Sequence, residues 1–260
     1  MVTESATAPM VLTDRDRGVL RITLNRPAKR NAFHPDLIRD LSGVLTAADN
    51  DSSVNVLVIT GAGTTFCSGL DLVQLSSLAA DERVQYMGTF FSLLRQVYRL
   101  RQPVIAAVNG PAIAGGFDLA AFCDLRLCST AATFVQTEML LGITQIIHPL
   151  YKVIGLGRAM ELALTATPID ANEAYRIVLV SRICLPKELM TVAMTLAQTL
   201  AARPRCALIE IKRLSRDVID LDTEAAMNRM FEAISDRLKS EEHVQAIQNY
   251  IAGLKHSRSI

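Results

Sequence analysis

The sequence predicts an α/β fold whose C-terminal part is helical, and the prediction rests on where strand-like and helix-like patterns fall. Residues 18–27 (GVLRITLNRP) alternate apolar and polar side chains, which is the period of a half-buried strand. Residues 54–60 (VNVLVIT) and 104–108 (VIAAV) are almost entirely apolar, as are strands covered on both faces. From Pro149 onward the apolar residues follow mainly helical spacing.

Helices are predicted between these strands. The apolar residues from Leu37 to Ala48 recur at helical spacing, which predicts a helix between the first two strands. The same spacing predicts a helix over residues 81–101, which ends before Pro103. After Asp118 we expect a short helical segment and a strand over residues 125–128. Strands and helices therefore alternate without a sequence repeat.

The C-terminal part is predicted to consist of successive helices. Helical spacing covers residues 158–166, 171–177 and 189–202 and, after Pro204, about 207–218 and 223–254. The last helix carries more apolar side chains than a small domain can bury, namely Met227, Met230, Phe231, Ile234, Leu238, Val244 and Ile247. We therefore expect this helix to pack against another subunit.

Composition limits the class of protein. With 260 residues, 50% of them hydrophobic and 20% charged, the chain can bury a full core and form one domain with an appendage. Lys and Arg number 27 against 26 Asp and Glu, so the net charge is +1 and a general nucleic-acid binder is disfavoured. No secretory signal pattern or membrane-length apolar stretch is recognised. These features predict a soluble, cytoplasmic protein with neither a nucleic-acid nor a membrane partner.

Cysteine, histidine and serine patterns argue against several kinds of site. The five cysteines show neither CxxC nor metal-finger spacing, so buried or incidental thiols in a reducing compartment are expected. The histidines are scattered and predict no metal site: His34, His148, His243 and His256. Ser68 lacks the GxSxG elbow of serine hydrolases. Gly61-Ala-Gly63 follows a strand like a dinucleotide fingerprint, but its third glycine is missing, so a turn is the better interpretation.

Two glycine turns and two acids form a stronger candidate site. Small residues at Gly69-Leu70 and Gly115-Gly116 let the backbone approach a ligand, and N–H groups from both turns could converge on one carbonyl oxygen. Taken singly, each is more often only a turn. Asp118 and Glu138 lie among apolar residues, where a charge has a partner or a function. For Asp118, a helix-capping or salt-bridged acid is as consistent as catalysis.

Several stretches together resemble the enoyl-CoA hydratase/isomerase (crotonase) superfamily. They are LNRPAKRNAF, VLVITGAGTTFCSGLDL, PVIAAVNGPAIAGGFDLAAFCDLRL, FVQTEMLLG and GLGRAMELALTATPIDANEAYRIVLVSRI, followed by the helical tail. The resemblance implies a spiral of ββα units over residues 1–200. It also implies a helical region over residues 201–260 that covers the pocket and builds a homotrimer or a dimer of trimers.

The resemblance implies an acyl-CoA thioester as substrate, with coenzyme A as part of that substrate and no separate cofactor or metal. The N–H groups of Leu70 and Gly115 would form the oxyanion hole, and Glu138 and Asp118 would be the two catalytic acids. The remaining substrate contacts would come from Ser68, Gly69, Asp71 and, near the CoA phosphates, Lys29.

The sequence departs from the hydratase pattern near these acids. Asp118 replaces a glutamate, which withdraws the carboxylate by roughly 1.5 Å, and a misplacement of this size can cost about a hundredfold in rate. Thr137 replaces a proline. Residues 143–149 (ITQIIHP) replace a glycine-rich run, which predicts a bulkier pocket wall. Asp118 with Glu138 also resembles the dienoyl-CoA isomerases, but Ile146 stands where their further aspartate would be.

The leading prediction is a lyase of the hydratase type that adds water across the double bond of a 2-enoyl-CoA through a stabilised thioester enolate. The alternatives are an enoyl-CoA isomerase that uses Glu138 as a single proton shuttle, and a non-catalytic acyl-CoA binder.

Overall fold

The fold is built on a twisted six-stranded sheet with the strand order β1-β2-β3-β4-β6-β9. The structure is a computed structural model, and it describes residues 9–257. β1 and β2 are antiparallel, and every other neighbouring pair is parallel. The strands are β1 (Val11–Asp16), β2 (Val19–Leu24), β3 (Val56–Gly61), β4 (Val104–Val108), β6 (Leu125–Ser129) and β9 (Arg182–Cys184).

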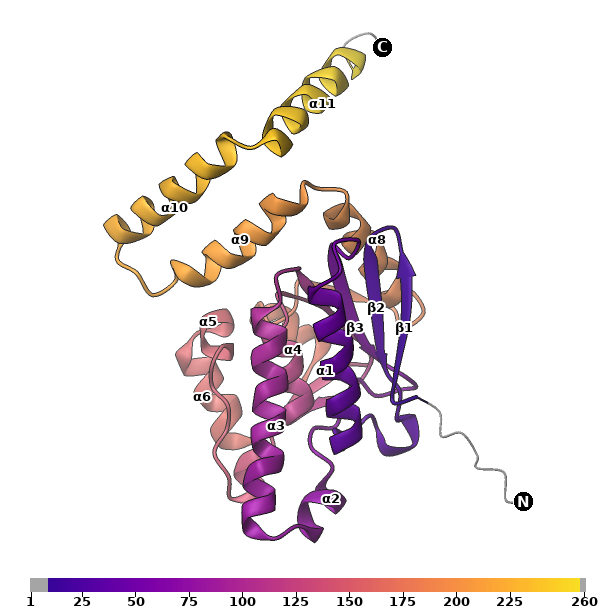
Figure 1. Cartoon of the computed structure of the whole chain (residues 1–260). Coiled ribbons are helices and arrows are strands. Elements are labelled where there is room, and N and C mark those ends of the chain that lie inside the picture. Colours follow the sequence, from indigo (N-terminus) through magenta and orange to yellow (C-terminus); the bar gives the residue numbers. More distant parts are fainter. Residues whose placement is uncertain (1–8, 258–260) are drawn as a thin grey trace, which may run out of the picture.

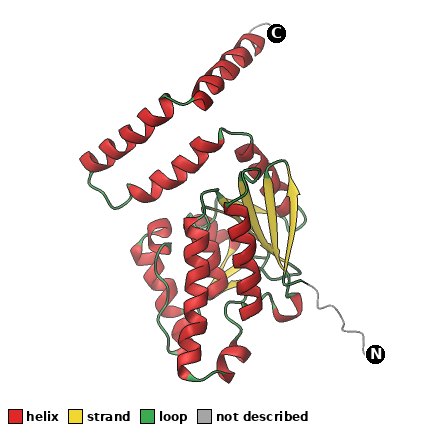
Figure 2. Cartoon of the chain, viewed as in Figure 1, coloured by secondary structure: helices red, strands yellow, loops and turns green. Residues whose placement is uncertain are grey.

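Alternate residues of the central strands face two separate cores. Ile22, Ile59 and Ala106 belong to the larger core, and Val58 and Ile105 belong to the smaller one. The larger core lies under α1 (Pro35–Asp49), α3 (Ala80–Arg99) and α4 (Gly115–Phe122), and the smaller one under α8 (Leu189–Ala201). Figures 1 and 2 show α1 and α3 packed against one face of the sheet, with α8 near its upper end.

A second, three-stranded sheet and short helices complete the body of the molecule. The second sheet has the order β5-β7-β8, with β5 (Ala112–Ile113), β7 (Thr133–Val135) and β8 (Ile169–Asp170). The short helices are η1 (Pro27–Lys29), α2 (Leu72–Ser77), η2 (Glu138–Leu141), α5 (Leu150–Ile154), α6 (Leu156–Thr165) and α7 (Ala171–Arg176). The end of β5 passes directly into α4, which positions the glycine turn at residues 115–116.

The C-terminal helices are α9 (Arg205–Asp217), α10 (Thr223–Leu238) and α11 (Glu241–Ser257). Figure 1 shows α9 lying over the body, α10 running back alongside α9 on its far side, and α11 continuing beyond α10; α10 and α11 are called the arm below. The prediction of one helix over residues 223–254 is wrong, because the chain breaks at Lys239-Ser240. Ser240 starts a new helix by accepting a hydrogen bond from His243 N to its Oγ at 3.2 Å.

The arm exposes the apolar row that the sequence indicated. In α10, Ala233 is the only buried residue, and Phe231 is 72% exposed. In α11, Val244 and Ile247 are 52% and 45% exposed.

Cysteine placement agrees with the sequence. Cys67, Cys123, Cys128 and Cys184 are buried thiols, and Cys206 is exposed and also free.

Over residues 9–257, no helix is both long and apolar enough to cross a membrane. Within the same range, no group of three or more His, Cys, Asp or Glu side chains could hold a metal ion.

Candidate active site

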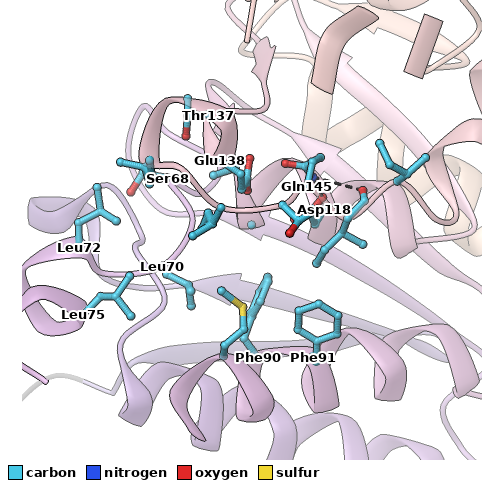
Figure 3. Close-up of a pocket in the computed structure, with 18 of the residues that line it drawn as sticks. Ser68, Leu70, Leu72, Leu75, Phe90, Phe91, Asp118, Thr137, Glu138 and Gln145 are labelled. Carbon is cyan, nitrogen blue, oxygen red and sulfur yellow. Dashed lines mark hydrogen bonds between the residues drawn. The ribbon is translucent and has the colours of Figure 1, made fainter. Parts of the chain in front are cut away.

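A cavity of about 540 Å³ lies between α3, the start of α4 and η2. Its lining is mainly apolar, with Leu70, Leu72, Leu75, Met87, Phe90, Phe91, Leu141, Ile143, Ile146 and Ile147. Its polar side chains are Ser68, Asp118, Thr137, Glu138, Thr144, Gln145 and His148. Figure 3 shows Glu138, Asp118 and Gln145 on one wall, with Phe90 and Phe91 facing them from α3. Apolar walls around a few polar groups are typical of a small-molecule site.

Two backbone turns meet at this cavity. Gly69 has φ +84°, and a Cβ built on it would lie 3.0 Å from Gly115 N. Only glycine allows both this conformation and this approach. In the described turns and loops, the N–H groups of Leu70 and Gly115 donate to no backbone oxygen. Both remain available to a ligand, since both residues line the cavity.

The turn before α4 is strained. Ala114 has φ +49°, a left-handed value that an L-residue with a Cβ rarely adopts, and Ala114 N donates to Val135 O at 2.8 Å. Such a conformation costs on the order of 1–3 kcal/mol and persists where the surroundings impose it, often at a ligand site. Gly115 follows at the start of α4, where a Cβ would meet the Phe90 ring at 2.7 Å.

Asp118 and Glu138 bring two carboxyl groups to the same cavity. Asp118, in the first turn of α4, is 3% exposed, and Glu138, at the start of η2, is 9% exposed. Asp118 Oδ1 accepts a hydrogen bond of 2.9 Å from Gln145 Nε2. Among the described residues, no cationic side chain pairs with Asp118, which leaves its salt-bridge interpretation without support.

Burial raises the pKa values of both acids above those of ordinary surface carboxylates. Burial raises the pKa of Asp118 well above its usual value, and the negative charge of Glu138 raises it further, whereas the hydrogen bond from Gln145 lowers it. Burial also raises the pKa of Glu138, against backbone hydrogen bonds that lower it. Asp118 is the more deeply buried of the two acids, so burial favours the protonated form of its carboxyl more strongly than that of Glu138. Two titratable groups in one cavity with pKa values raised to different extents are suited to acid–base chemistry.

The segment over residues 143–148 forms much of the cavity wall, as its sequence indicated. His148 lines the cavity and lies edge-on to Tyr98 at a ring distance of 6.1 Å. Gln145 binds Asp118 directly and was not predicted from the sequence. A single glutamine in a loop belongs to no recognised motif, and the segment departs from the family's glycine-rich run, so no sequence signal marked it.

The other predicted substrate contacts are placed differently. Ser68 lines the cavity, and Gly69 forms the turn behind it. Asp71 Oδ1 accepts from Gln74 N at the start of α2, and Asp71 Oδ2 pairs with Arg26 at 3.1 Å. Lys29 is exposed in η1. Within residues 9–257, neither Asp71 nor Lys29 lines the cavity.

The glycine turn after β3 is occupied by the chain itself. The Asn31 side-chain amide donates to Ala62 O, Thr65 O and Phe66 O at 2.9, 2.8 and 3.2 Å. A Cβ on Gly110 would lie 1.9 Å from Thr64 O, so another loop packs directly against this turn. These contacts agree with the interpretation of residues 61–66 as a structural turn.

The fold and site define an enzyme of the crotonase superfamily. The sequence model of the enoyl-CoA hydratase/isomerase family matches residues 14–256. The chain is 32% identical to the short-chain-enoyl-CoA hydratase of Clostridium acetobutylicum over 93% of this chain and 94% of that protein. It is also 32% identical to the crotonyl-CoA hydratase of Syntrophomonas wolfei, over 84% and 85% of the two chains.

A solved structure supports the same assignment. The crystal structure of an enoyl-CoA hydratase from Bacillus anthracis matches with a TM-score of 0.91 and 27% identity, over 94% of this chain and 96% of that one. The chain therefore belongs to the enoyl-CoA hydratase/isomerase family.

Proposed function

We propose that the protein is an enoyl-CoA hydratase that adds water across the double bond of a 2-enoyl-CoA. The observation that carries the proposal is the pair Asp118 and Glu138, two buried acids with raised pKa values that line one apolar cavity. The names of the two relatives, a short-chain-enoyl-CoA hydratase and a crotonyl-CoA hydratase, support the same reaction.

The thioester carbonyl binds at the two turns. Leu70 N–H and Gly115 N–H donate to the carbonyl oxygen and stabilise the negative charge that develops on it in the enolate. Each well-placed donor of this kind lowers the barrier by roughly 3 kcal/mol. The apolar side chains of α3 and of residues 143–147 surround the acyl chain.

The acids carry the protons. Ionised Glu138 takes a proton from water as the water oxygen bonds to C3, and the C2–C3 π electrons move into the thioester enolate. Protonated Asp118 then gives its proton to C2 as the enolate collapses. The product gains one water, and proton exchange with solvent restores both acids. General acid–base catalysis of this kind contributes about 10²–10⁴-fold to the rate.

Isomerisation is the second candidate, and one observation favours it. Asp118 Oδ1 is already bound by Gln145, whereas Glu138 Oε2 has no hydrogen-bond partner among the described residues. Glu138 alone could therefore move a proton between C2 and C4. A third possibility, a non-catalytic acyl-CoA binder, needs only the two N–H groups and the apolar walls.

Assays with two substrates separate these candidates. Incubation with crotonyl-CoA is expected to remove the absorbance of the conjugated thioester and to yield a 3-hydroxyacyl-CoA, identified by mass spectrometry. Conversion of a 3-enoyl-CoA to the conjugated 2-enoyl-CoA, without hydration, would support the isomerase. Binding of acyl-CoA with no turnover of either substrate would support the binder. Glu138→Gln is expected to abolish either activity, and full turnover in this variant would reject both catalytic assignments.

The proposal extends to assembly and to the CoA end of the substrate. The exposed apolar row of α10 and α11 supports a homotrimer or a dimer of trimers, and a monomer in sedimentation equilibrium would contradict it. The exposed ammonium of Lys29 supports a contact with the CoA phosphates. Lys29→Ala is then expected to raise KM without changing kcat. The reaction as written uses no cofactor besides the coenzyme A of the substrate.

A further inference from the structure

Gln145 has its amide orientation fixed by two donated hydrogen bonds. Its Nε2 donates to Asp118 Oδ1 at 2.9 Å and to Ile146 O at 3.2 Å. These bonds use both N–H donors of the amide. Ile146 O can only accept a hydrogen bond, so rotating the amide by half a turn would set two acceptors against each other there, and the amide oxygen is held in one direction.

Two acceptor atoms on this cavity wall have no donor among the described residues. They are Gln145 Oε1 and Glu138 Oε2, and both are buried. Both residues line the cavity that holds Asp118. Buried acceptors in native proteins are normally hydrogen-bonded to protein or to ordered water, and a donor for these two would come from the cavity that both residues line. Water has two O–H donors and matches a pair of acceptors.

The shorter side chain of Asp118 leaves room for a second polar side chain, Gln145, at this wall of the cavity. An aspartate reaches less far than the glutamate of the usual hydratase pair, and Gln145 already binds one of its oxygens. An additional acceptor is then needed to orient the water beside Glu138. The segment over residues 143–148 supplies one in Gln145.

We propose that Gln145 is a positioning residue: its N–H groups fix Asp118 as the proton donor, and its Oε1, with Glu138 Oε2, holds the water that is added. This inference rests on the proposed hydratase function. The water gives one proton to Glu138 and its oxygen to C3, while its second O–H remains bonded to Gln145 Oε1. Asp118 delivers the proton to C2, as above, and Gln145 gains and loses no proton.

The charged groups around Asp118 are few, which makes its titration interpretable. Glu138 is the ionisable group that raises its pKa, and Gln145 provides the hydrogen bond that lowers it. His148 lines the same cavity, and burial and the charge of Lys152 lower its pKa, whereas the charge of Asp220 raises it. Lys152, on α5, is itself paired with Asp220 at 2.6 Å.

The kinetic test replaces the amide by a thioether of similar shape in Gln145→Met. The kcat for crotonyl-CoA is expected to fall about tenfold to a hundredfold with KM within about twofold, because the water and Asp118 lose their alignment. The basic limb of the kcat/KM profile should move to higher pH, because Asp118 loses the bond that lowers its pKa. Gln198→Met is the matched control, since Gln198 also donates to an aspartate, Asp16, but lies outside the cavity.

A second measurement does not depend on turnover. Carbon-13 NMR of labelled aspartate carboxyls follows the protonation of Asp118, assigned by its loss in Asp118→Asn, and should show a higher pKa in Gln145→Met. An unchanged kcat or an unchanged Asp118 pKa in this variant would overturn the proposal. If the wild-type chain hydrates no enoyl-CoA but the Asp118 pKa still rises in Gln145→Met, the proposed function fails while the positioning of Asp118 by Gln145 stands.

Discussion

Gly69 shows how one residue without a side chain joins two parts of the site. Its φ of +84° turns the chain so that Leu70 lines the cavity. The position that a Cβ of residue 69 would occupy lies against Ala114 and Gly115. A methyl group at this position would meet Ala114 Cβ at 2.9 Å and Ile113 O at 3.0 Å. Two backbone segments would have to move apart, and the N–H groups of Leu70 and Gly115 would move with them.

Gly69→Ala is therefore expected to lower the free energy of unfolding by about 1–3 kcal/mol and to reduce kcat for the hydration reaction. Urea denaturation and steady-state kinetics measure the two effects. Gly43→Ala is the control, because Gly43 lies within α1 and a Cβ there meets nothing within 4 Å. This variant should gain roughly 0.5–1 kcal/mol. Equal effects of the two substitutions would refute the argument from close approach.

The residues of the site differ in how far sequence could predict them. Asp118 and Glu138 stand out as acids within apolar stretches beside glycine turns, the family resemblance implied that they share one site, and both line the same cavity. The sequence could not predict that Asp71 would be engaged by Arg26, because the two residues are 45 positions apart and meet only in the folded chain. Gln145 was missed for the same reason, since its partner lies 27 positions away.

At the scale of elements, α9 is held to the body by a cluster of charges in which Lys212 is buried and its partners are partly buried. Lys212 Nζ lies 2.7 Å from Asp124 Oδ2 and donates to Gln102 O at 2.7 Å. Arg216 binds Asp124 Oδ1 at 2.6 Å and lies 3.9 Å above the Tyr98 ring. Asp124 thus connects α9 with the sheet, since its Oδ2 also accepts from Val104 N at 2.8 Å.

Removing the charge of Asp124 is expected to lower the free energy of unfolding more than removing the charge of Lys212. Asp124→Asn leaves the buried ammonium of Lys212 without its counter-charge and should lower the free energy of unfolding by about 3 kcal/mol. Lys212→Met should cost no more than about 1.5 kcal/mol, because Asp124 keeps Arg216 and Val104 N. The exposed pair of Arg213 and Glu210 provides a control, and Arg213→Met should change stability by less than about 1 kcal/mol. Urea unfolding measures all three, and equal losses in Asp124→Asn and Arg213→Met would contradict the role of the buried pair.

The elements were predictable where their apolar pattern was strong. β3 and β4 are buried along their whole length, and α1 and α8 show regular helical spacing. β1 was not predicted, because its sequence VLTDRD is mostly polar and exposed at the edge of the sheet. The break between α10 and α11 was missed because the apolar spacing continues through Ser240, where capping rather than hydrophobicity decides the outcome.

At the scale of the whole molecule, the raised pKa of Asp118 makes the free energy of unfolding fall as pH rises. The folded-state pKa of Asp118 lies well above its ordinary value of 3.8, so between these two pKa values the native chain binds more protons than the unfolded chain. The contribution of Asp118 is therefore fully present below the unfolded pKa and is lost as pH rises through the folded pKa.

Asp118→Asn removes this titration and can keep the acceptor for Gln145. The variant is expected to gain stability over the wild type as pH rises, by at most about 1.4 kcal/mol per pH unit, while its kcat falls about 10²–10⁴-fold. Urea unfolding at several pH values from about 4 to about 9 gives the comparison. Parallel stability curves for the two proteins would show that Asp118 is not buried with a raised pKa.

The backbone N–H groups of Leu70 and Gly115 also affect which substitutions the site can accept during evolution. They belong to the main chain, so no single codon change outside proline can delete the N–H groups themselves. In the proposed reaction, substitutions of the surrounding side chains, such as those of Leu70, Phe91 or Ile146, would reshape the space for the acyl chain without removing the two N–H donors. A lineage could therefore explore new acyl groups while keeping the proposed contact with the thioester.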